Sequence, residues 1–284
     1  MIRLCAFADE ADSALGGQIA ALRRNGIEYI ELRGINGKNV SEITENEARD
    51  YAKELAAGGI SVWSIGSPIG KVGINDDLEA HFDKLRHICR LAKIFGTDKI
   101  RMFSFYGAYG ERERVFAALR RMVEIAKGYG VGLYHENEKD IYGDTAERVR
   151  DIMANVEGLY YVYDPANYIA VGEDVSESIK LYGSTDYFHI KDMIRETGEI
   201  VPAGYGDGEI YQLVDMIPTG KDTVLTVEPH LSLFSGFSAI DNTEMKNRFV
   251  YKDNNESFDA AVAAITEVLC KAGYSRTGNG FSKK

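Results

Sequence analysis

Four acidic or imidazole side chains lie at or near the ends of four successive segments that otherwise read as buried strands. The segments are LYHENE, YVYDPANY, FHIKD and LTVEPHL, and they carry Glu136, Asp164, His189 and Glu228. Carboxylates that are buried close together are costly to desolvate and raise one another's pKa, and a divalent cation removes both costs. Three carboxylates and one imidazole make a mostly oxygen ligand set that suits Mn²⁺ or Mg²⁺, with Zn²⁺ or Co²⁺ as competitors. We therefore predict one metal site, provided that the fold brings the four residues together.

The segment FHIKD shows how a strand would separate polar from apolar side chains. Because strand residues alternate between two faces, His189 and Lys191 share one face while Phe188 and Ile190 share the other. If the apolar face packs against helices, the polar pair points into the interior. In the alternative interpretation His189 is an ordinary core histidine and each carboxylate is neutralised by its own Lys or Arg. That arrangement would remove the argument for a metal-dependent enzyme.

The rest of the chain alternates between strand and helix patterns. Segments typical of strands lie at residues 2–8, 29–33, 60–66, 99–106, 131–137, 159–164, 187–192 and 223–228. Helical patterns, several of them ending in glycine, lie at residues 18–26, 45–59, 76–96, 111–130, 144–156 and 257–273. Eight such units in roughly 250 residues are what a closed (β/α)₈ TIM barrel needs, and its active site lies at the C-terminal ends of the strands. An open doubly wound sheet is the alternative, although no GxGxxG motif opens the first helix.

The composition narrows the domain organisation and the classes of function. The chain has 284 residues, of which 45% are apolar, and no linker divides it, so we expect one domain over residues 1–284. The net charge of −11 argues against binding to nucleic acid or to a membrane surface. The chain contains no apolar run of about 18 residues, so we expect no transmembrane helix. The N-terminus lacks the basic and then apolar layout of a signal peptide. The three cysteines are widely spaced, which suits a reducing compartment, and we expect a cytoplasmic protein.

Several segments resemble a known family. LYHENE, YDPANY, HIKD, VPAGYGDGE and LTVEPHL look like the sugar phosphate isomerase/epimerase family of xylose isomerase-like TIM barrels. The resemblance continues upstream through YIELRGINGKNV, WSIGSPIGK and IRMFSFY, and so covers most of the chain. This superfamily includes ketose 3-epimerases, hydroxypyruvate isomerases, inosose dehydratases and the endonuclease IV group. The resemblance implies one metal ion held by Glu136, Asp164, His189 and Glu228, a small carbohydrate substrate, and a fold that commonly forms homo-oligomers.

The resemblance also implies a reaction. In the epimerases the two glutamates, here Glu136 and Glu228, are the acid/base pair as well as metal ligands. A metal with open positions acts as a Lewis acid on the carbonyl and the neighbouring hydroxyl of a keto sugar. One glutamate takes the α-proton and the other returns a proton. We therefore expect an isomerase or epimerase of a small keto sugar or a related polyol ketone.

Two basic residues after the seventh strand are candidates for substrate binding. Lys191 shares the face of His189, where it either contacts a substrate oxygen or neutralises an acid. Arg195 lies six residues after His189, and in ketose epimerases an arginine at this offset reaches the substrate. A further basic residue, Arg101, is expected to pair with Glu31 inside the barrel, as a stabilising contact.

Asn167 and His230 complete the predicted substrate site. Asn167 follows Asp164 by three residues, where the ketose 3-epimerases have a histidine, so the chain departs from those enzymes at this position. His230 lies two residues after Glu228 and has the same strand parity. It is expected to contact either the substrate or the metal ligands.

Two loops near the expected site have both structural and functional interpretations. Residues 202–209 are rich in glycine and form either a turn in which Asp207 caps the next helix or a loop that faces the substrate with its backbone N–H groups. Residues 231–256 are expected to form a long insertion that acts as a lid or an oligomer arm. Phe234 and Phe237 within it either cover the site or pack the loop.

Three rival functions remain open at this point. A metal-dependent dehydratase of the inosose type would start from the same removal of a proton. A barrel that binds a sugar without turning it over is the second rival, although the pair of glutamates weighs against it. An endonuclease of the endonuclease IV kind is disfavoured, because that group has a trinuclear, histidine-rich zinc site, whereas this chain has five histidines and a net charge of −11.

Overall fold

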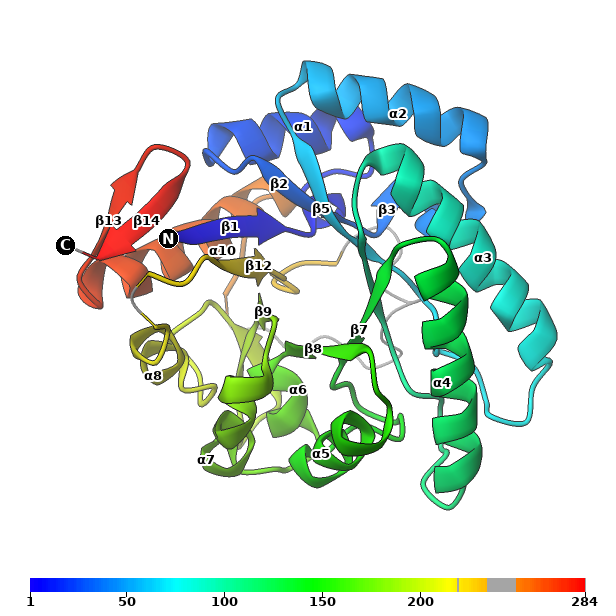
Figure 1. The fold of residues 1–284 in the computed structure, drawn as a ribbon. Coiled ribbons are helices and arrows are strands. Elements are labelled where there is room, and N and C mark those ends of the chain that lie inside the picture. The colour runs from blue at the N-terminus through cyan, green and yellow to red at the C-terminus, as the bar shows by residue number, and fades with distance from the viewer. Residues whose placement is uncertain (219, 234–248, 284) are drawn as a thin grey trace.

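Eight parallel strands close into a barrel. The computed structural model describes residues 1–218, 220–233 and 249–283. The barrel strands are β1 (Ile2–Ala6), β2 (Tyr29–Leu32), β5 (Ser61–Gly66), β6 (Lys99–Met102), β7 (Gly132–Glu136), β8 (Leu159–Tyr163), β9 (Tyr187–Ile190) and β12 (Thr223–Val227). They follow the order β12-β9-β8-β7-β6-β5-β2-β1, and the pairing of β12 with β1 closes the ring (Figure 1). The (β/α)₈ prediction is therefore confirmed over the open sheet.

All eight predicted strands are present, and they end at or before the predicted residue. The largest difference is in β6, which ends at Met102, four residues before the predicted end at Tyr106. The ends of β8 and β12 lie one residue earlier than predicted, so Asp164 and Glu228 directly follow their strands. The polar residues of interest are thus at the junctions between strands and loops, where a barrel places its active site.

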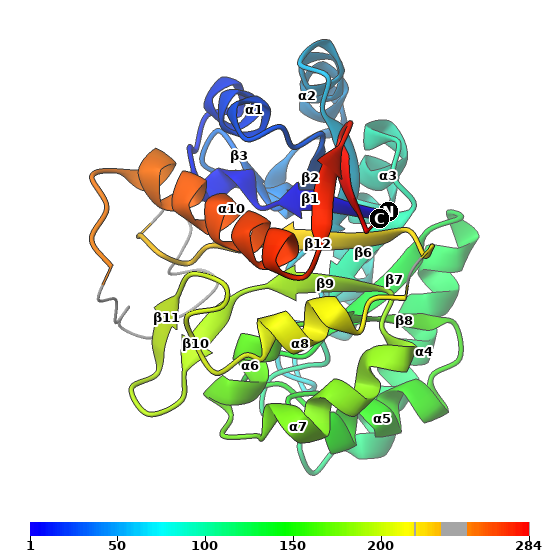
Figure 2. The same cartoon turned by 90° about the vertical axis from the view of Figure 1, so that its left-hand side faces the viewer.

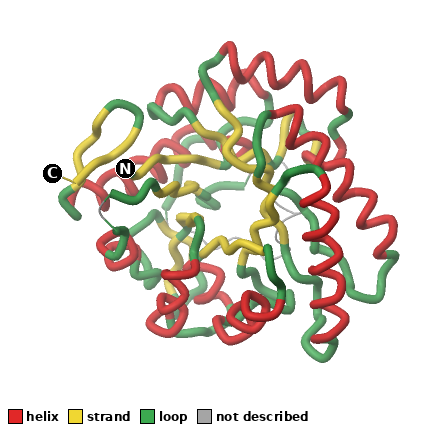
Figure 3. The backbone as a smooth tube through the Cα atoms, in the orientation of Figure 1, coloured by secondary structure: helices red, strands yellow, loops and turns green. Residues whose placement is uncertain are grey.

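In the part of the chain that the structure describes, six helices of ten or more residues surround the strands. They are α1 (Leu15–Arg24), α2 (Glu45–Ala57), α3 (Leu78–Phe95), α4 (Arg112–Gly128), α5 (Ala146–Asn155) and α10 (Asn254–Lys271), and Figure 3 shows them outside the ring of strands. A capping box between Thr44 and Glu47 starts α2, and Gly96 ends α3 with a φ of 75°, a conformation that favours glycine. Among the described residues, no helix combines the length and the apolar character that a membrane span needs.

Shorter elements join the long ones, and most were not predicted. They comprise α6 (Pro165–Ala170), α7 (Val175–Ser178), α8 (Ile210–Asp215), the hairpin of β3 (Gly34–Ile35) and β4 (Lys38–Asn39), the hairpin of β10 (Asp192–Ile194) and β11 (Glu199–Val201), and 3₁₀ helices at Ala8–Glu10, Val40–Glu42 and Ile179–Ser184. Figure 2 shows the β10–β11 hairpin beyond the C-terminal ends of the strands. It therefore lies at the end of the barrel where the site is expected.

The barrel interior is aromatic near the N-terminal ends of the strands and charged near the C-terminal ends. The ring of Trp63 lies edge-on to Tyr29, with centroids 5.8 Å apart, and to Tyr187 at 6.1 Å. Tyr187 packs in turn against Tyr134. The same cluster includes Cys5, Val162 and Val224. These side chains close the barrel beneath the charged residues, in place of the aliphatic layers that usually fill a TIM barrel.

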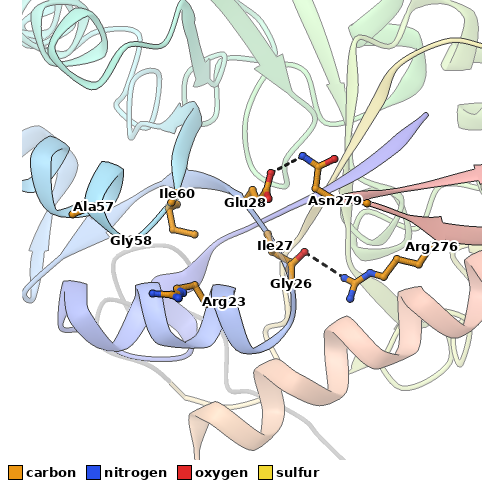
Figure 4. Close-up of a pocket in the computed structure, with 11 residues that line it drawn as sticks. Arg23, Gly26, Ile27, Glu28, Ala57, Gly58, Ile60, Arg276 and Asn279 are labelled. Atoms are coloured by element: carbon orange, nitrogen blue, oxygen red, sulfur yellow. Dashed lines mark hydrogen bonds between the residues drawn. The ribbon is translucent and has the colours of Figure 1, made fainter.

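A C-terminal hairpin of β13 (Tyr274–Thr277) and β14 (Gly280–Lys283) extends the sheet at the N-terminal end of the barrel, where Phe281 pairs with Ile2. A cavity of about 470 Å³ lies between this hairpin and the residues that precede β2 and β5 (Figure 4). The hairpin residues on its wall are tied to the barrel, since Arg276 donates to the backbone oxygen of Gly26 and Asn279 to the carboxylate of Glu28. This end of a TIM barrel serves stability, and the charged interior opens at the other end.

Candidate metal centre

The four predicted metal ligands meet at the C-terminal end of the barrel. Glu136, Asp164, His189 and Glu228 each offer one ligand atom, and these atoms all lie within 4.8 Å of one another. All four side chains are buried. Nδ1 of His189 lies 3.0 Å from Oε1 of Glu136 and 3.6 Å from Oε2 of Glu228. Side chains from four successive barrel strands therefore converge on one point.

The strand ends and one short helix position these side chains. Glu136 is the last residue of β7, and His189 lies in β9. Asp164 follows β8 and is the N-cap of α6, where its Oδ1 accepts the backbone N–H of Asn167 at 3.1 Å. Pro165 occupies the first turn of α6, a position at which the missing N–H of proline costs nothing. The sequence DPAN thus turns the chain sharply and fixes the backbone of Asp164.

Asn137, which sequence reasoning did not identify, joins the ends of β7 and β8. Its side-chain amide donates to the backbone oxygen of Asp164 at 2.8 Å, and its side-chain oxygen accepts the N–H of the same residue at 3.0 Å. The hydroxyl of Tyr161 donates to that oxygen at 3.0 Å. The paired bonds resemble those between neighbouring strands, and they fix the position of Asp164 relative to Glu136 along the barrel axis. In the sequence, Asn137 could have been identified only from its position directly after the predicted ligand Glu136.

Each of the three ligand carboxylates also contacts a basic side chain. Nζ of Lys191 lies 3.0 Å from Oδ2 of Asp164 and 3.3 Å from Oε2 of Glu228. Nε of Arg101 lies 3.1 Å from Oε2 of Glu136, and Nη1 of Arg33 lies 3.3 Å from Oε1 of Glu228. The two interpretations of the sequence are therefore both realised in part, because the acids are gathered and each has a cation nearby.

The balance of charge separates the two interpretations. Ion pairs connect a buried cluster that has more acids than bases: Asp9, Glu10, Glu31, Glu136, Asp164 and Glu228 against Arg33, Arg101 and Lys191, together with the imidazoles of His189 and His230. Six carboxylates thus face three permanent cations. Protons reduce the excess of negative charge, because burial raises the pKa of Glu10 to about 8 and that of Asp164 to about 7, and the carboxylates around His189 raise its pKa as well. Oδ2 of Asp164 is buried and has the ammonium of Lys191 at 3.0 Å as its ion-pair partner. A divalent cation with oxygen ligands suits a buried cluster in which acids outnumber bases.

The proton affinities of the carboxylates differ. Burial raises the pKa of Asp164 to about 7, although the charge of Lys191 opposes the shift. Burial acts in the same direction on Glu228, but the positive charges around it, chiefly Lys191, outweigh burial and hold its pKa well below the ordinary value. Burial alone would lower the pKa of His189, and the carboxylates around it, chiefly Glu136, instead raise that pKa well above its usual value. Neighbouring carboxylates whose pKa values differ are typical of sites that transfer protons.

Three of the four predicted substrate-binding residues lie within or against this cluster. Lys191 bridges two of the acids, as described above. Nε2 of His230 lies 3.6 Å from Oε1 of Glu228. The side-chain amide of Asn167 lies 3.3 Å from Oε1 of Glu136 and donates to it, so it holds a predicted ligand in place. Contact with a substrate stays a prediction for all three residues.

The glycine-rich loop at residues 202–209 is organised around one carboxylate. Asp192 accepts the backbone N–H groups of Met193, Gly204, Gly206 and Gly208 at 2.8–3.0 Å. A Cβ on Gly206 would lie 2.4 Å from Oδ1 of Asp192, so the close approach requires glycine. In one of the two interpretations of the sequence, the N–H groups of this loop faced a substrate. They bind Asp192 instead, and the glycine-rich composition serves the packing of the loop.

Asp207 and Arg195 contact each other, and the contacts described below do not include the four predicted ligands. Asp207 does not cap α8 as expected, because the residue before this helix is Glu209, in a left-handed conformation with a φ of 53° and without a side-chain cap. Oδ2 of Asp207 instead accepts the backbone N–H of Arg195 at 2.7 Å. The exposed guanidinium of Arg195 donates to the backbone oxygen of Glu173 at 2.9 Å. The contact of Arg195 with a substrate stays a prediction.

Glu31 has a larger part in the site than the sequence indicated. It lies 3.8 Å from Nε of Arg101, as expected, and it also contacts Nε2 of His189 at 3.2 Å. Both ring nitrogens of the predicted ligand therefore face carboxylates. The long insertion expected at residues 231–256 ends earlier, because α10 begins at Asn254. Phe234 and Phe237 lie outside the described residues.

The sequence matches the model of one protein family, described as the xylose isomerase-like TIM barrel, over residues 19–249. The chain belongs to this family. The matched range contains seven of the eight barrel strands and all four predicted ligands, so the resemblance seen in the motifs is confirmed. No curated protein matches the sequence.

Solved structures share the fold of this xylose isomerase-like barrel. An L-ribulose 3-epimerase is 22% identical, with a TM-score of 0.71 and 96% of each chain covered. An IolI protein with a bound zinc atom is 17% identical, with a TM-score of 0.72 over 95% of this chain and 99% of the other. The probable 3-DHS dehydratase AsbF of Bacillus anthracis is 17% identical, with a TM-score of 0.69 over 94% and 99%. Identities this low establish the fold and leave the reaction to be argued from the site.

Proposed function

We propose that this xylose isomerase-like barrel is a divalent-metal-dependent isomerase or epimerase that acts on a small keto sugar or a related polyol ketone. The observation that carries the proposal is the meeting of three carboxylates and one imidazole within 4.8 Å at the C-terminal end of the barrel. The excess of buried acids over bases supports a cation there. The fold shared with an epimerase and with a zinc-binding protein agrees with it. Mn²⁺ or Mg²⁺ suits the three carboxylates best, with Zn²⁺ and Co²⁺ as competitors.

We assign roles to the residues of the chain as part of this proposal. An ion held by Glu136, Asp164, His189 and Glu228 would supply Lewis acidity toward a carbonyl oxygen. Glu136 and Glu228 then move the proton, one accepting it from the α-carbon and the other returning one, in an order that the stereochemistry of the substrate sets. Glu228 is kept ionised by its basic neighbours and so is ready to accept. Lys191, beside it, is placed to donate a hydrogen bond to a substrate oxygen.

A metal-dependent dehydratase is the second candidate. It begins with the same removal of a proton, and the dehydratase AsbF shares the fold. The ammonium of Lys191, which lies 3.3 Å from Oε2 of Glu228, can donate a hydrogen bond to a departing hydroxyl group, although the carboxylates around it raise its pKa well above the ordinary value. A barrel that binds sugars without turnover is the remaining alternative.

Proton exchange in D₂O tests the proposal directly. The protein loaded with Mn²⁺ or Mg²⁺ should exchange the α-proton of at least one member of a panel of ketoses, inososes and hydroxypyruvate, followed by NMR. Glu136→Gln and Glu228→Gln should each lower the exchange rate by at least about 10²-fold, because a positioned general base contributes about that much. Glu138→Gln is the matched control, since Glu138 pairs with Lys71 at 3.1 Å and is not one of the four predicted ligands.

The outcomes distinguish the three candidates. Exchange with a rearranged ketose as product supports an isomerase or epimerase, and exchange with a dehydrated product supports a lyase. Binding of a sugar without exchange would point to the non-catalytic barrel. Equal exchange by the wild type and by both glutamine variants would contradict the assignment of the acid/base pair.

A further inference from the structure

Phe7 lies at the centre of the charged interior, although it carries no charge itself. It follows β1 directly, and its side chain is fully buried. The edge of its ring meets His189, with centroids 5.1 Å apart and an interplanar angle of 83°. The guanidinium of Arg33 lies 4.4 Å from the ring centroid, and that of Arg101 lies 5.5 Å from it. One aromatic ring thus supports a predicted metal ligand and two arginines.

The two arginines hold the two glutamates in the same way. Nη1 of Arg33 contacts Oε1 of Glu228 at 3.3 Å, and Nε of Arg101 contacts Oε2 of Glu136 at 3.1 Å. One oxygen of each glutamate is therefore engaged by a guanidinium. The other oxygen of each faces Nδ1 of His189, at 3.0 Å for Glu136 and 3.6 Å for Glu228. The arginines thus leave Oε1 of Glu136 and Oε2 of Glu228 on the side of His189.

Each arginine is itself anchored on the side away from the glutamate. Arg33 makes a two-pronged ion pair with Asp9, with contacts of 2.9 and 3.0 Å. Arg101 donates to the backbone oxygen of Ser67 at 3.0 Å. The paired contacts of Arg33 fix the plane of its guanidinium as well as its place, and the single bond to Ser67 anchors one end of Arg101. The orientation is therefore imposed on the glutamates by parts of the chain that are not ligands.

Gly66, at the end of β5, leaves room for this arrangement. A Cβ at this position would lie 2.7 Å from Cε1 of Phe7, 3.2 Å from Nη2 of Arg101 and 3.4 Å from Cβ of Arg33. Its backbone φ is not positive, so the conformation of the chain does not require glycine here. The space does, because the ring and both arginines occupy it.

We propose that Phe7, Arg33 and Arg101 form a positioning unit that presets one oxygen of Glu136, one oxygen of Glu228 and the ring of His189 toward a divalent ion. The inference rests on the proposed function, because it concerns the metal of that site. Phe7 touches neither the ion nor the substrate in this role. It acts through the two guanidinium groups and the imidazole, as the groups that orient metal ligands do elsewhere.

The substitution Phe7→Met tests positioning apart from charge, because it leaves every charged residue and every ligand in place. We expect it to bind Co²⁺ about 10–100-fold more weakly than the wild type, the range observed when groups behind metal ligands are replaced. The visible d–d spectrum of bound Co²⁺ should also change, since the spectrum reports the geometry of the ligands. Titration calorimetry and absorption spectroscopy measure the two effects. Neither measurement depends on turnover.

Phe116→Met is the matched control, and Arg33→Lys is the second variant. Phe116 is also fully buried and has an arginine, Arg112, 4.4 Å from its ring centroid, but it lies in α4 outside the barrel. The Phe116→Met variant should bind Co²⁺ with the affinity and the spectrum of the wild type. Arg33→Lys keeps the charge and loses the two-pronged geometry, so it should also weaken Co²⁺ binding. This variant tests the positioning unit even if Phe7→Met does not fold.

The results that overturn the inference differ from those that overturn the function. If folded Phe7→Met and Arg33→Lys both bind Co²⁺ with the affinity and spectrum of the wild type, the positioning role is wrong and the metal site stands. A loss of affinity in Phe116→Met equal to that in Phe7→Met would also overturn it, since the effect would then be one of general packing. A wild-type protein that binds no divalent ion would overturn the proposed function, and the role of Phe7 with it.

Discussion

Lys191 contacts two of the predicted metal ligands, so in the proposed function its ammonium and the metal ion compete for the same oxygens. Its ammonium contacts Asp164 at 3.0 Å and Glu228 at 3.3 Å, and both carboxylates are predicted ligands. A buried charge at this distance acts strongly on an ion, because the protein interior screens it far less than water does. Lys191 therefore lowers the cost of burying the acids before a metal binds and opposes the metal that would replace it.

We predict that Lys191→Met binds Mn²⁺ at least about tenfold more tightly than the wild type, because a positive charge next to two ligands is removed. Without metal, the variant should lose about 3–5 kcal/mol of unfolding free energy, the usual cost of leaving buried charges unpaired. Calorimetric titration and thermal unfolding with and without Mn²⁺ measure both effects. Lys71→Met is the control, since Lys71 pairs with Glu138 outside the cluster. Weaker binding of Mn²⁺ by Lys191→Met would show that Lys191 helps to hold the ion.

At the scale of the elements, the connections after the strands do more than link them to helices. After β9 the chain forms the β10–β11 hairpin and then folds residues 202–209 back onto Asp192. A carboxylate that accepts four backbone N–H groups replaces much of the hydration that it loses on burial. Asp192 lies three residues after His189 and next to Lys191, so the order of this loop is linked to the backbone that carries the site.

We predict that Asp192→Asn loosens this loop. The amide has one acceptor oxygen, so backbone N–H groups that met the second carboxylate oxygen would face an NH₂ group instead. The free energy of unfolding should fall by about 2–3 kcal/mol, and amide exchange at Gly204, Gly206 and Gly208 should speed up. Hydrogen–deuterium exchange and urea unfolding measure the two effects. Asp207→Asn is the control, because Asp207 accepts one backbone bond at an exposed position, and a result equal to that of Asp192→Asn would contradict the prediction.

At the scale of the whole molecule, two histidines that are not among the predicted metal ligands link stability to pH. His81, in α3, accepts the backbone N–H of Gly70 at 2.9 Å, and burial, with the nearby charge of Lys84, lowers its pKa to about 4. Burial lowers the pKa of His135 in β7 to about 3. Both folded-state values lie below the ordinary value of 6.5. The unfolded chain therefore binds more protons than the folded one between these values, and the contribution to stability is complete above 6.5 and lost as the pH falls toward 4 and 3.

We predict that His81→Gln reduces this pH dependence. Glutamine offers an acceptor to the N–H of Gly70 and does not titrate. The loss of unfolding free energy between about pH 7 and about pH 4.5 should be smaller than in the wild type by about 2 kcal/mol, because one unit of pKa shift corresponds to about 1.4 kcal/mol. Urea unfolding at the two pH values measures the difference. Equal losses in the two proteins would show that His81 is not the titrating group.

The residues missed by sequence reasoning share one property. Asp9, Glu10, Arg33 and Asn137 lie after strand ends, but strand parity does not predict their partners, because each belongs to a loop whose path depends on its neighbours. Arg33 contacts Asp9 and Glu228, which are 24 and 195 residues away in the sequence. The path of the glycine-rich loop was missed for the same reason, since Asp192 could bind four N–H groups only once the loop had turned back.

The sequence by itself determined the barrel, its eight strands and the ends at which Glu136, Asp164, His189 and Glu228 would gather. These follow from local periodicity and from the rule that parallel strands in a closed barrel share one C-terminal edge. Only the tertiary structure decided which cation faces each acid, which oxygen of each glutamate faces His189, and that one ring, Phe7, lies against both arginines. Those features depend on distances of 3–5 Å between residues far apart in the chain, and no local pattern encodes them.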